Sequence, residues 1–408
     1  MKKNYLFSVL ALMLGVAGAG AQCPVSVVVK NPIGERKDAP IVLKLNDAKG
    51  VKSAIVKDGQ AEIPCQLDDL DGDGIYDELC FVSDFGKKEK KTFSVELSKT
   101  SLQKEYPART YADMMLKSNN KAPSPQYIVV PEMAADGNAD TYHMQYHHGP
   151  EFESELTGYR IYFDERQTVD MYGKYKKQLE LSQTTFYPST EQKAAGFGDD
   201  VLWVGNTFGA GALRGWDGSH PTMVSPCKIR RNKVLANGPV RAIVDVIDEG
   251  WAYGSGEPIT MRIRYTIWAG HRDCDVDVKF REAPTGLKFS TGVINVKNST
   301  EFSDKSGTRG CWGTDWPAGA TNQKGHKLET VGLAVSIPKQ YIVSEQPADS
   351  DNYGFVIATD TDELHYAISL ASDNEIFGFH SVKEWSEYLK AWGKECNNPV
   401  EIMNGCCK

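Results

Sequence analysis

Two neighbouring segments of the sequence carry the residues best suited to chemistry. Residues 158–163 and 168–174 each alternate apolar with polar side chains. Because successive side chains of a β-strand point to opposite faces, each segment predicts a strand with one core face and one polar face. The turn at residues 165–167 predicts a hairpin with Tyr162 opposite Asp170 and Arg160 opposite Tyr172. One solvent-facing patch is therefore expected, formed by Arg160, Tyr162, Asp170, Tyr172 and Lys174.

This patch combines cations, phenols and a carboxylate, which suits elimination from an acidic sugar. Arginine and lysine side by side can bind a sugar carboxylate, the arginine through two parallel hydrogen bonds. Such binding lowers the pKa of the neighbouring C–H group, which a β-elimination must break. Tyrosine or histidine can act as base or acid, and two histidines precede the Gly149–Pro150 turn. The predicted catalytic residues are His147, His148, Arg160, Tyr162 and Lys174.

The same region leaves other functions open. Paired carboxylates are the catalytic groups of most glycoside hydrolases, and a β-sandwich can also bind a glycan without reacting. Arg–Asp and Tyr–Asp pairs, in turn, often only connect the strands of a sheet. The carboxylates available for hydrolysis are Glu151, Glu153, Glu155, Asp164 and Asp170.

Aromatic and polar residues near Gly or Pro form a second candidate group. Loops at the rim of a sheet concentrate functional residues, and tryptophan can stack on a sugar ring, although many tryptophans simply fill the base of a loop. His271, Arg272, Trp312 and His326 share this setting. The predicted substrate-binding residues are Asp170, Tyr172, Trp203, Arg214, Trp216, His220, Asp315 and Trp316.

An acidic loop between residues 69 and 78 resembles the first half of a calcium-binding EF-hand loop. Carboxylates alternate along it, and Gly74 stands where such loops turn sharply. Cys80 occupies the position of the usual bidentate glutamate. The loop therefore predicts either a structural Ca²⁺ site or an acidic hairpin tip closed by a Cys65–Cys80 disulfide. Any such ion is expected to be structural, and no cofactor is expected to take part in catalysis. The predicted metal ligands are Asp69, Asp71, Asp73 and Asp77.

Short strands separated by turn residues dominate the rest of the chain and predict an all-β protein. Residues 22–104 are expected to form a small N-terminal β-rich domain. Residues 105–408 are expected to form a large antiparallel β-sandwich. A capping box at Ser381–Glu384 and an apolar stripe predict one clear helix. The strands expected in the larger domain include residues 178–186, 201–205, 241–247, 260–268, 275–280 and 332–337.

The N-terminus predicts export. Lys2 and Lys3 precede a short apolar run that ends in Ala19-Gly20-Ala21, the pattern of a secretory signal peptide over residues 1–21. A secreted or periplasmic protein is expected, without a membrane span. The nine cysteines then predict some disulfides, with Cys406 and Cys407 stapling the C-terminal tail. The net charge of −8 argues against nucleic acid as a partner.

Three segments resemble a family of exported bacterial proteins that accompany polysaccharide-degrading systems and have long been labelled a domain of unknown function. These segments are residues 159–174, 66–78 and 313–326. The resemblance implies a mutarotase-like β-supersandwich related to polysaccharide lyases. One member of that family is assigned as a dehydratase of ulvan oligosaccharides. The resemblance thus implies that the His, Tyr, Arg and Lys cluster is catalytic and that an acidic oligosaccharide is the substrate.

Overall fold

The computed structural model describes residues 11–12, 24–46, 48–117, 126–317 and 326–403. Antiparallel sheets make up most of the secondary structure of these residues, and the pairing of β1 (Ala11–Leu12) with β3 (Arg36–Leu45) is the one parallel pair among the strands described. The all-β prediction is therefore confirmed. The described part contains no helix long and apolar enough to cross a membrane.

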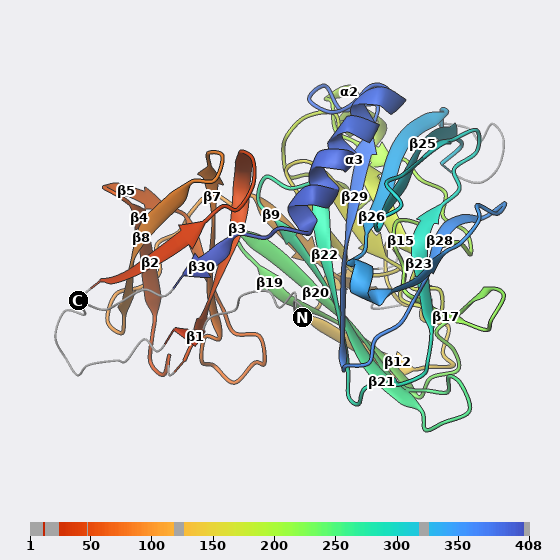
Figure 1. Ribbon diagram of the computed structural model, residues 1–408, viewed down its shortest axis with the longest axis horizontal. Helices are drawn as coiled ribbons and strands as arrows, with labels where there is room; N and C mark the ends of the chain where they lie inside the picture. Colours follow the sequence, from red (N-terminus) through yellow and green to blue (C-terminus); the bar gives the residue numbers. More distant parts are fainter. Residues whose placement is uncertain (1–10, 13–23, 47, 118–125, 318–325, 404–408) are drawn as a thin grey trace.

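Two facing sheets form a smaller unit at the N-terminal end (Figure 1). Their inward side chains, such as Val27, Phe81 and Phe93, build one hydrophobic core. The last described strand, β30 (Glu401–Met403), returns to this unit and pairs with β2 (Val25–Lys30). In order across the first sheet, the strands are β1 (Ala11–Leu12), β3 (Arg36–Leu45), β7 (Glu78–Phe85) and β6 (Cys65–Asp68). In order across the second sheet, they are β30 (Glu401–Met403), β2 (Val25–Lys30), β8 (Lys90–Ser98), β4 (Ser53–Asp58) and β5 (Ala61–Ile63).

The larger unit is built on a sheet of nine strands. Strands of two smaller sheets pack on one face of it and enclose the main hydrophobic core. In order across the sheet the nine strands are β12 (Glu132–Asp136), β19 (Ile229–Asn237), β20 (Arg241–Trp251), β21 (Ile259–Trp268), β22 (Asp273–Phe280), β29 (Glu363–Ser372), β26 (Glu329–Ser336), β25 (Thr308–Asp315) and β24 (Thr300–Ser303).

The smaller sheets carry five of the predicted site residues: Arg160, Asp170, Tyr172, Arg214 and Trp216. One five-stranded sheet runs β16 (Asp199–Asp200), β15 (Val169–Gly173), β14 (Gly158–Ile161), β13 (Glu151–Ser154) and β9 (Thr110–Asp113). The other runs β18 (Pro221–Thr222), β17 (Arg214–Trp216), β23 (Phe289–Ile294), β28 (Asn352–Ile357) and β27 (Ile342–Glu345). A two-stranded sheet is formed by β10 (Met115–Lys117) and β11 (Tyr127–Val129).

Three α-helices and one 3₁₀ turn are present in the described part: α1 (Leu181–Thr184), α2 (Thr190–Ala194), α3 (Val382–Cys396) and η1 (Lys339–Tyr341). The predicted helix is α3. Its Ser381 side chain accepts from the Glu384 N–H, as predicted, but the Glu384 carboxylate accepts from the His380 N–H rather than closing a box on Ser381. Trp385 and Leu389 pack on the outer face of the large sheet.

Two predicted strands are wrong. Residues 178–186 form a turn and α1, and residues 201–205 lack strand pairing. The alternating run of residues 178–181 is typical of a strand. However, the backbone N–H groups of Glu180 and Leu181 donate to the buried carboxylate of Glu153 instead of to a neighbouring strand. A long-range contact has overridden the local pattern.

The predicted Cys65–Cys80 disulfide is also wrong. Cys65 lies opposite Phe81 and Cys80 opposite Gln66, so the two cysteines are one residue out of register. Alternation then points their side chains to opposite faces of the sheet. Both thiols are free and buried. Cys406, Cys407 and nearly all of the predicted signal peptide lie outside the described residues.

Candidate functional site

The predicted polar patch lies on one face of the sheet formed by β9, β13, β14, β15 and β16. In the observed register Arg160 is opposite Asp170 on one side and Glu151 on the other. Arg160 is therefore not the cross-strand partner of Tyr172, and Tyr162 is not the cross-strand partner of Asp170, contrary to the prediction. The observed register differs from the predicted one by two residues. Because side chains alternate with a period of two, the predicted patch residues still share one face, although their cross-strand partners change.

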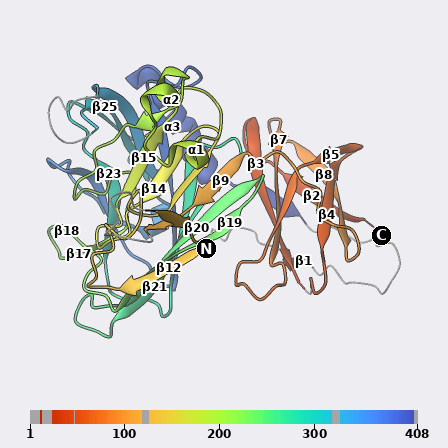
Figure 2. The ribbon, with the colours of Figure 1, turned by 180° about the vertical axis from the view of Figure 1, so that it is seen from behind.

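This face is buried rather than open to solvent, contrary to the prediction. The segment that contains α1 folds across it: α1 lies against β9 and β13, and Figure 2 shows α1 beside β9. The Phe186 ring lies 3.9 Å from the guanidinium carbon of Arg160, and Leu181 and Phe186 enclose Tyr172. The exposed fraction is 2% for Arg160 and 0% for Lys174 and Tyr172.

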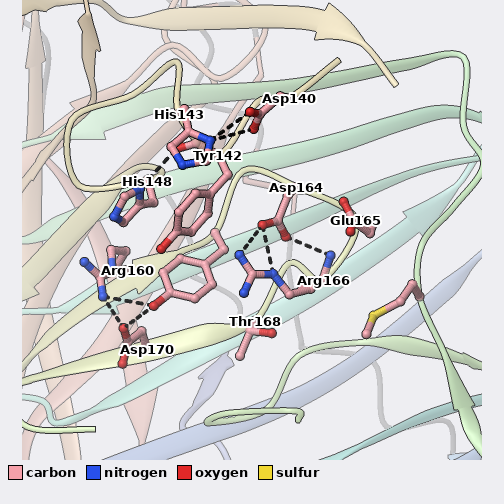
Figure 3. A network of polar contacts seen from close by, with 12 residues as sticks. Asp140, Tyr142, His143, His148, Arg160, Asp164, Glu165, Arg166, Thr168 and Asp170 are labelled. Atoms are coloured by element: carbon pink, nitrogen blue, oxygen red, sulfur yellow. Dashed lines mark hydrogen bonds and ion pairs between the residues drawn. The ribbon is translucent and has the colours of Figure 1, made fainter. Parts of the chain in front are cut away.

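Arg160 is the centre of a polar network (Figure 3). Its guanidinium donates to the Asp170 carboxylate, to the Tyr162 hydroxyl at 3.2 Å and to the Tyr187 hydroxyl at 2.6 Å. Asp200 lies 3.3 Å away. The Tyr162 hydroxyl donates to Asp170 at 3.1 Å. Burial, followed by the charge of Asp170, raises the pKa of Tyr162, so its phenol keeps its proton.

Lys174 belongs to a separate network on the same face. Its ammonium pairs with Glu153 and donates to the carbonyl oxygens of Ser154 and Gln178. These three acceptors use the three protons of an ammonium group. Tyr172 donates to Glu180 at 2.8 Å. Lys174 and Tyr172 therefore hold the covering segment on the sheet, and the structure does not place them where a substrate could reach them.

His148 is the predicted catalytic residue with partial solvent access. Its imidazole stacks on the ring of Tyr142, with centroids 3.8 Å apart and planes at 5°. Its Nδ1 lies 3.0 Å from the Tyr142 carbonyl oxygen. Because a carbonyl only accepts hydrogen bonds, Nδ1 carries the proton and Nε2 carries the lone pair. Burial lowers the pKa of His148 to about 4.

Arg166, which belongs to the predicted turn at residues 165–167, lies on the other side of Tyr142 from His148 (Figure 3). Its guanidinium carbon is 4.9 Å from the ring centroids of both Tyr142 and Tyr162. Asp164 accepts from Arg166 Nε at 2.9 Å. Tyr142, Asp164 and Arg166 border a recess of about 340 Å³, whose other lining residues are Ala139, Asp140, Thr141, Glu165 and Asn206.

His147 is fully buried and faces two carboxylates. Its Nε2 lies 3.7 Å from an oxygen of Asp113 and 3.6 Å from an oxygen of Glu151. Burial lowers the pKa of His147 to about 3, and burial raises the pKa of Asp113 and of Glu151. Asp113 was missed because it is remote in sequence and only the β9–β13 pairing brings it next to Glu151.

The predicted substrate-binding residues on loops do not gather in one place. Trp203, Asp315 and Trp316 line a small recess of about 10 Å³, with the buried Glu329. Trp216 and the exposed His220 lie on the β17–β18 hairpin and its turn. Arg214 is buried, and it donates to the Thr168 hydroxyl and to the Thr207 carbonyl at 2.8 Å each. This arginine supports the fold rather than a site.

Three of the four predicted calcium ligands come together. Ligand oxygens of Asp69, Asp71 and Asp77 lie within 4.8 Å of one another. Asp73 is directed elsewhere, since its carboxylate accepts from the Ile75 N–H at 2.7 Å. The oxygen-only donor set suits Ca²⁺, and the calcium site stays a prediction.

The chain belongs to the family described as a domain of unknown function, DUF4861, which matches residues 29–402. The expected resemblance to a domain of unknown function agrees with this match, and the link to an ulvan oligosaccharide dehydratase stays a prediction. No curated protein matches the chain.

Two solved structures from Enterococcus faecalis are similar to the chain. A protein in the glycosyl hydrolase family 38 matches at 8% identity with a TM-score of 0.44, over 94% of this chain and 47% of that one. An alpha-mannosidase from strain V583 matches at 9% identity with a TM-score of 0.43, over 94% of this chain and 46% of that one. The chain thus spans about half the length of these structures, and similarity at this level carries no argument about activity.

Proposed function

We propose that this protein is an exported, carbohydrate-active enzyme that eliminates water or an alkoxide from an acidic oligosaccharide. The observation that carries the proposal is the stack of His148, Tyr142 and Arg166 beside the recess (Figure 3). The stack holds an imidazole nitrogen with a free lone pair, a phenol and a guanidinium cation next to one another. A β-elimination next to a sugar carboxylate needs these three kinds of group.

In the proposed reaction Arg166 pairs with the carboxylate of the sugar. Nε2 of His148 takes the proton from the carbon next to that carboxylate, and the electron pair of the broken C–H bond forms a C=C bond. The C–O bond at the β-carbon breaks, and the departing oxygen takes a proton from the Tyr142 phenol. The products are an unsaturated sugar and either water or the shortened glycan, so atoms and charge balance.

Partly exposed tyrosines near this cluster provide surfaces for sugar rings. Tyr127 and Tyr187 are 37% and 41% exposed, and Tyr146 contacts both, with centroids 4.2 and 6.2 Å away. Tyr187 also accepts from Arg160. Aromatic faces of this kind bind the apolar faces of sugars while their hydroxyls stay hydrated.

The test is incubation of the exported form of the protein with a panel of uronic-acid oligosaccharides. Mass spectrometry and ultraviolet absorbance report the product. We expect a conjugated product and, for a dehydratase, loss of the mass of one water. His148→Ala should slow the reaction by about 100-fold or more, the usual contribution of a general base.

His143→Ala is the matched control, because His143 is an exposed histidine that also contacts the Tyr142 ring, edge-to-face. We expect it to change the rate by no more than a few-fold. Products that gain one water would instead indicate hydrolysis. Thermal protection by an oligosaccharide that stays unchanged would indicate binding without catalysis, and either result would overturn the proposal.

A further inference from the structure

Three ligand-type side chains converge at one buried point on the same sheet face as Arg160. Asp113 ends β9, Glu151 begins β13, and His147 lies in the turn just before β13. Asp113 is 3% exposed, and His147 and Glu151 are 0% exposed. Their nearest nitrogen and oxygen atoms lie within 4.8 Å of one another.

With both carboxylates charged, the atoms that face each other have no hydrogen-bond partner within the described residues. These atoms are Nε2 of His147, Oδ1 of Asp113 and both carboxylate oxygens of Glu151. Nδ1 of His147 lies 2.8 Å from the Gly149 carbonyl oxygen and must carry the proton. Nε2 therefore directs its lone pair at two carboxylates. Leaving several buried polar atoms unpaired costs about 1–3 kcal/mol for each group.

Charge makes the arrangement more unfavourable still. Asp113 and Glu151 are directly opposite each other across β9 and β13, where like charges destabilise a sheet. Arg160, opposite Glu151 on the other side, directs its donors to Asp170, Tyr162 and Tyr187. A bound cation would satisfy all the unpaired atoms and both charges at once.

We propose that Asp113, His147 and Glu151 bind one divalent transition-metal ion of the Zn²⁺ or Mn²⁺ class. The Nε2–oxygen separations are 3.7 and 3.6 Å, longer than hydrogen bonds. They are close to the ~3.4 Å between ligand atoms of a tetrahedral site with bonds of about 2.1 Å. One imidazole and two carboxylates suit Zn²⁺, Mn²⁺ or Fe²⁺ better than Ca²⁺.

Outer hydrogen bonds already orient two of the ligands. The Gly149 carbonyl fixes the tautomer of His147, and the Tyr111 hydroxyl donates to Oδ2 of Asp113 at 2.7 Å, leaving Oδ1 for the ion. Contacts of this kind are typical around metal ligands. The inference rests on these contacts and is independent of the elimination chemistry proposed above.

The test measures metal content and affinity on the full chain. After treatment with a chelator, the protein is titrated calorimetrically with Zn²⁺ and with Mn²⁺, and elemental analysis gives the stoichiometry. We expect one ion per chain and an affinity at least about 100-fold lower in Glu151→Gln, because loss of an outer-shell partner alone costs about 10–100-fold. Asp69→Asn, in the surface acidic loop, is the control and should bind as the parent does.

A second measurement needs no variant. The X-ray absorption spectrum of the Zn²⁺-loaded protein should show imidazole nitrogen and carboxylate oxygen around the ion, whereas the surface loop offers oxygen alone. Absence of stoichiometric binding would overturn the proposal. So would loss of binding in Asp69→Asn, or an oxygen-only spectrum. Without an ion, Asp113 and Glu151 would have to share a proton, and Glu151→Gln would then be at least as stable as the parent.

Discussion

Lys174 shows at the scale of one residue how a functional pattern can serve the fold. Its ammonium is enclosed by Glu153 and by two carbonyl oxygens, with no access to solvent. Glu153 in turn accepts from the backbone of Glu180 and Leu181 at 2.7 and 2.8 Å. The pair thus attaches the covering segment to the sheet.

We predict that Lys174→Ala destabilises the protein by about 3–5 kcal/mol, because it leaves the Glu153 carboxylate buried without its counter-ion. Denaturant unfolding measures the change. Lys176→Ala is the control, since Lys176 makes an exposed contact at 3.2 Å and should cost no more than about 0.5 kcal/mol. The double variant Lys174→Met, Glu153→Gln should recover part of the loss. Equal stability of Lys174→Ala and the parent would show that the pair does not fasten the segment.

At the scale of elements, α3 depends on a close approach to β26. Trp385 lies over Gly332, where the strand has no side chain on the helix-facing side. A Cβ at Gly332 would lie 2.7 Å from one Trp385 ring carbon and 2.8 Å from a Trp312 ring carbon. The two indole rings therefore have little freedom to move aside.

Gly332→Ala is expected to destabilise the protein by about 1–3 kcal/mol, the usual cost of overpacking a core. Gly34→Ala is the matched control, because a Cβ there meets nothing within 4 Å, and it should change stability by no more than about 0.5 kcal/mol. Thermal unfolding compares the two. Similar melting temperatures for both variants would mean that α3 can shift away from the sheet at little cost.

At the scale of the whole molecule, polar contacts join the two units. Arg241 pairs with Asp68 and Glu78, both at 2.7 Å. Arg109 bonds Asp38 at 2.7 Å. His271 also contributes: its Nδ1 lies 3.0 Å from the Asp273 carboxylate and its Nε2 lies 2.8 Å from the Asp38 carbonyl oxygen. Both neighbours are acceptors, so the doubly protonated ring is the favoured form.

Burial opposes the charge of His271, but the charge and hydrogen bond of Asp273, the hydrogen bond to the Asp38 carbonyl and the charge of Asp275 together outweigh burial and raise the pKa to about 9. A folded-state pKa above the ordinary value of 6.5 stabilises the protein fully below about pH 6.5, and this stabilisation is lost as the pH rises through about 9. We therefore predict that the melting temperature falls over this window and falls less in His271→Gln. In His380→Gln, at an exposed histidine, the melting temperature should fall with pH as it does in the parent. If it also falls as in the parent in His271→Gln, His271 is not the group that causes this pH dependence.

Local patterns predicted much of this protein because alternation and capping depend on residues close in sequence. The sharing of one face by Arg160, Tyr162 and Asp170 follows from the two-residue period of a strand. The start of α3 follows from Ser381. The exact strand partners did not follow, since Asp164 accepts from the Arg166 N–H and Gln167 adopts φ 45°, which sets a different turn.

Sequence by itself determined that the chain is all-β, that one sheet face is rich in Arg, Tyr and Asp, and that residues 69–77 form an acidic loop. Tertiary structure alone decided that α1 covers that face, that Arg166 and Tyr142 meet His148 beside a recess, and that Asp113 reaches His147 and Glu151. The physical reason is distance along the chain. Hydrophobic burial fixes which face of a strand turns inward, whereas the partner of a buried charge is chosen by long-range strand pairing and packing that no local pattern encodes.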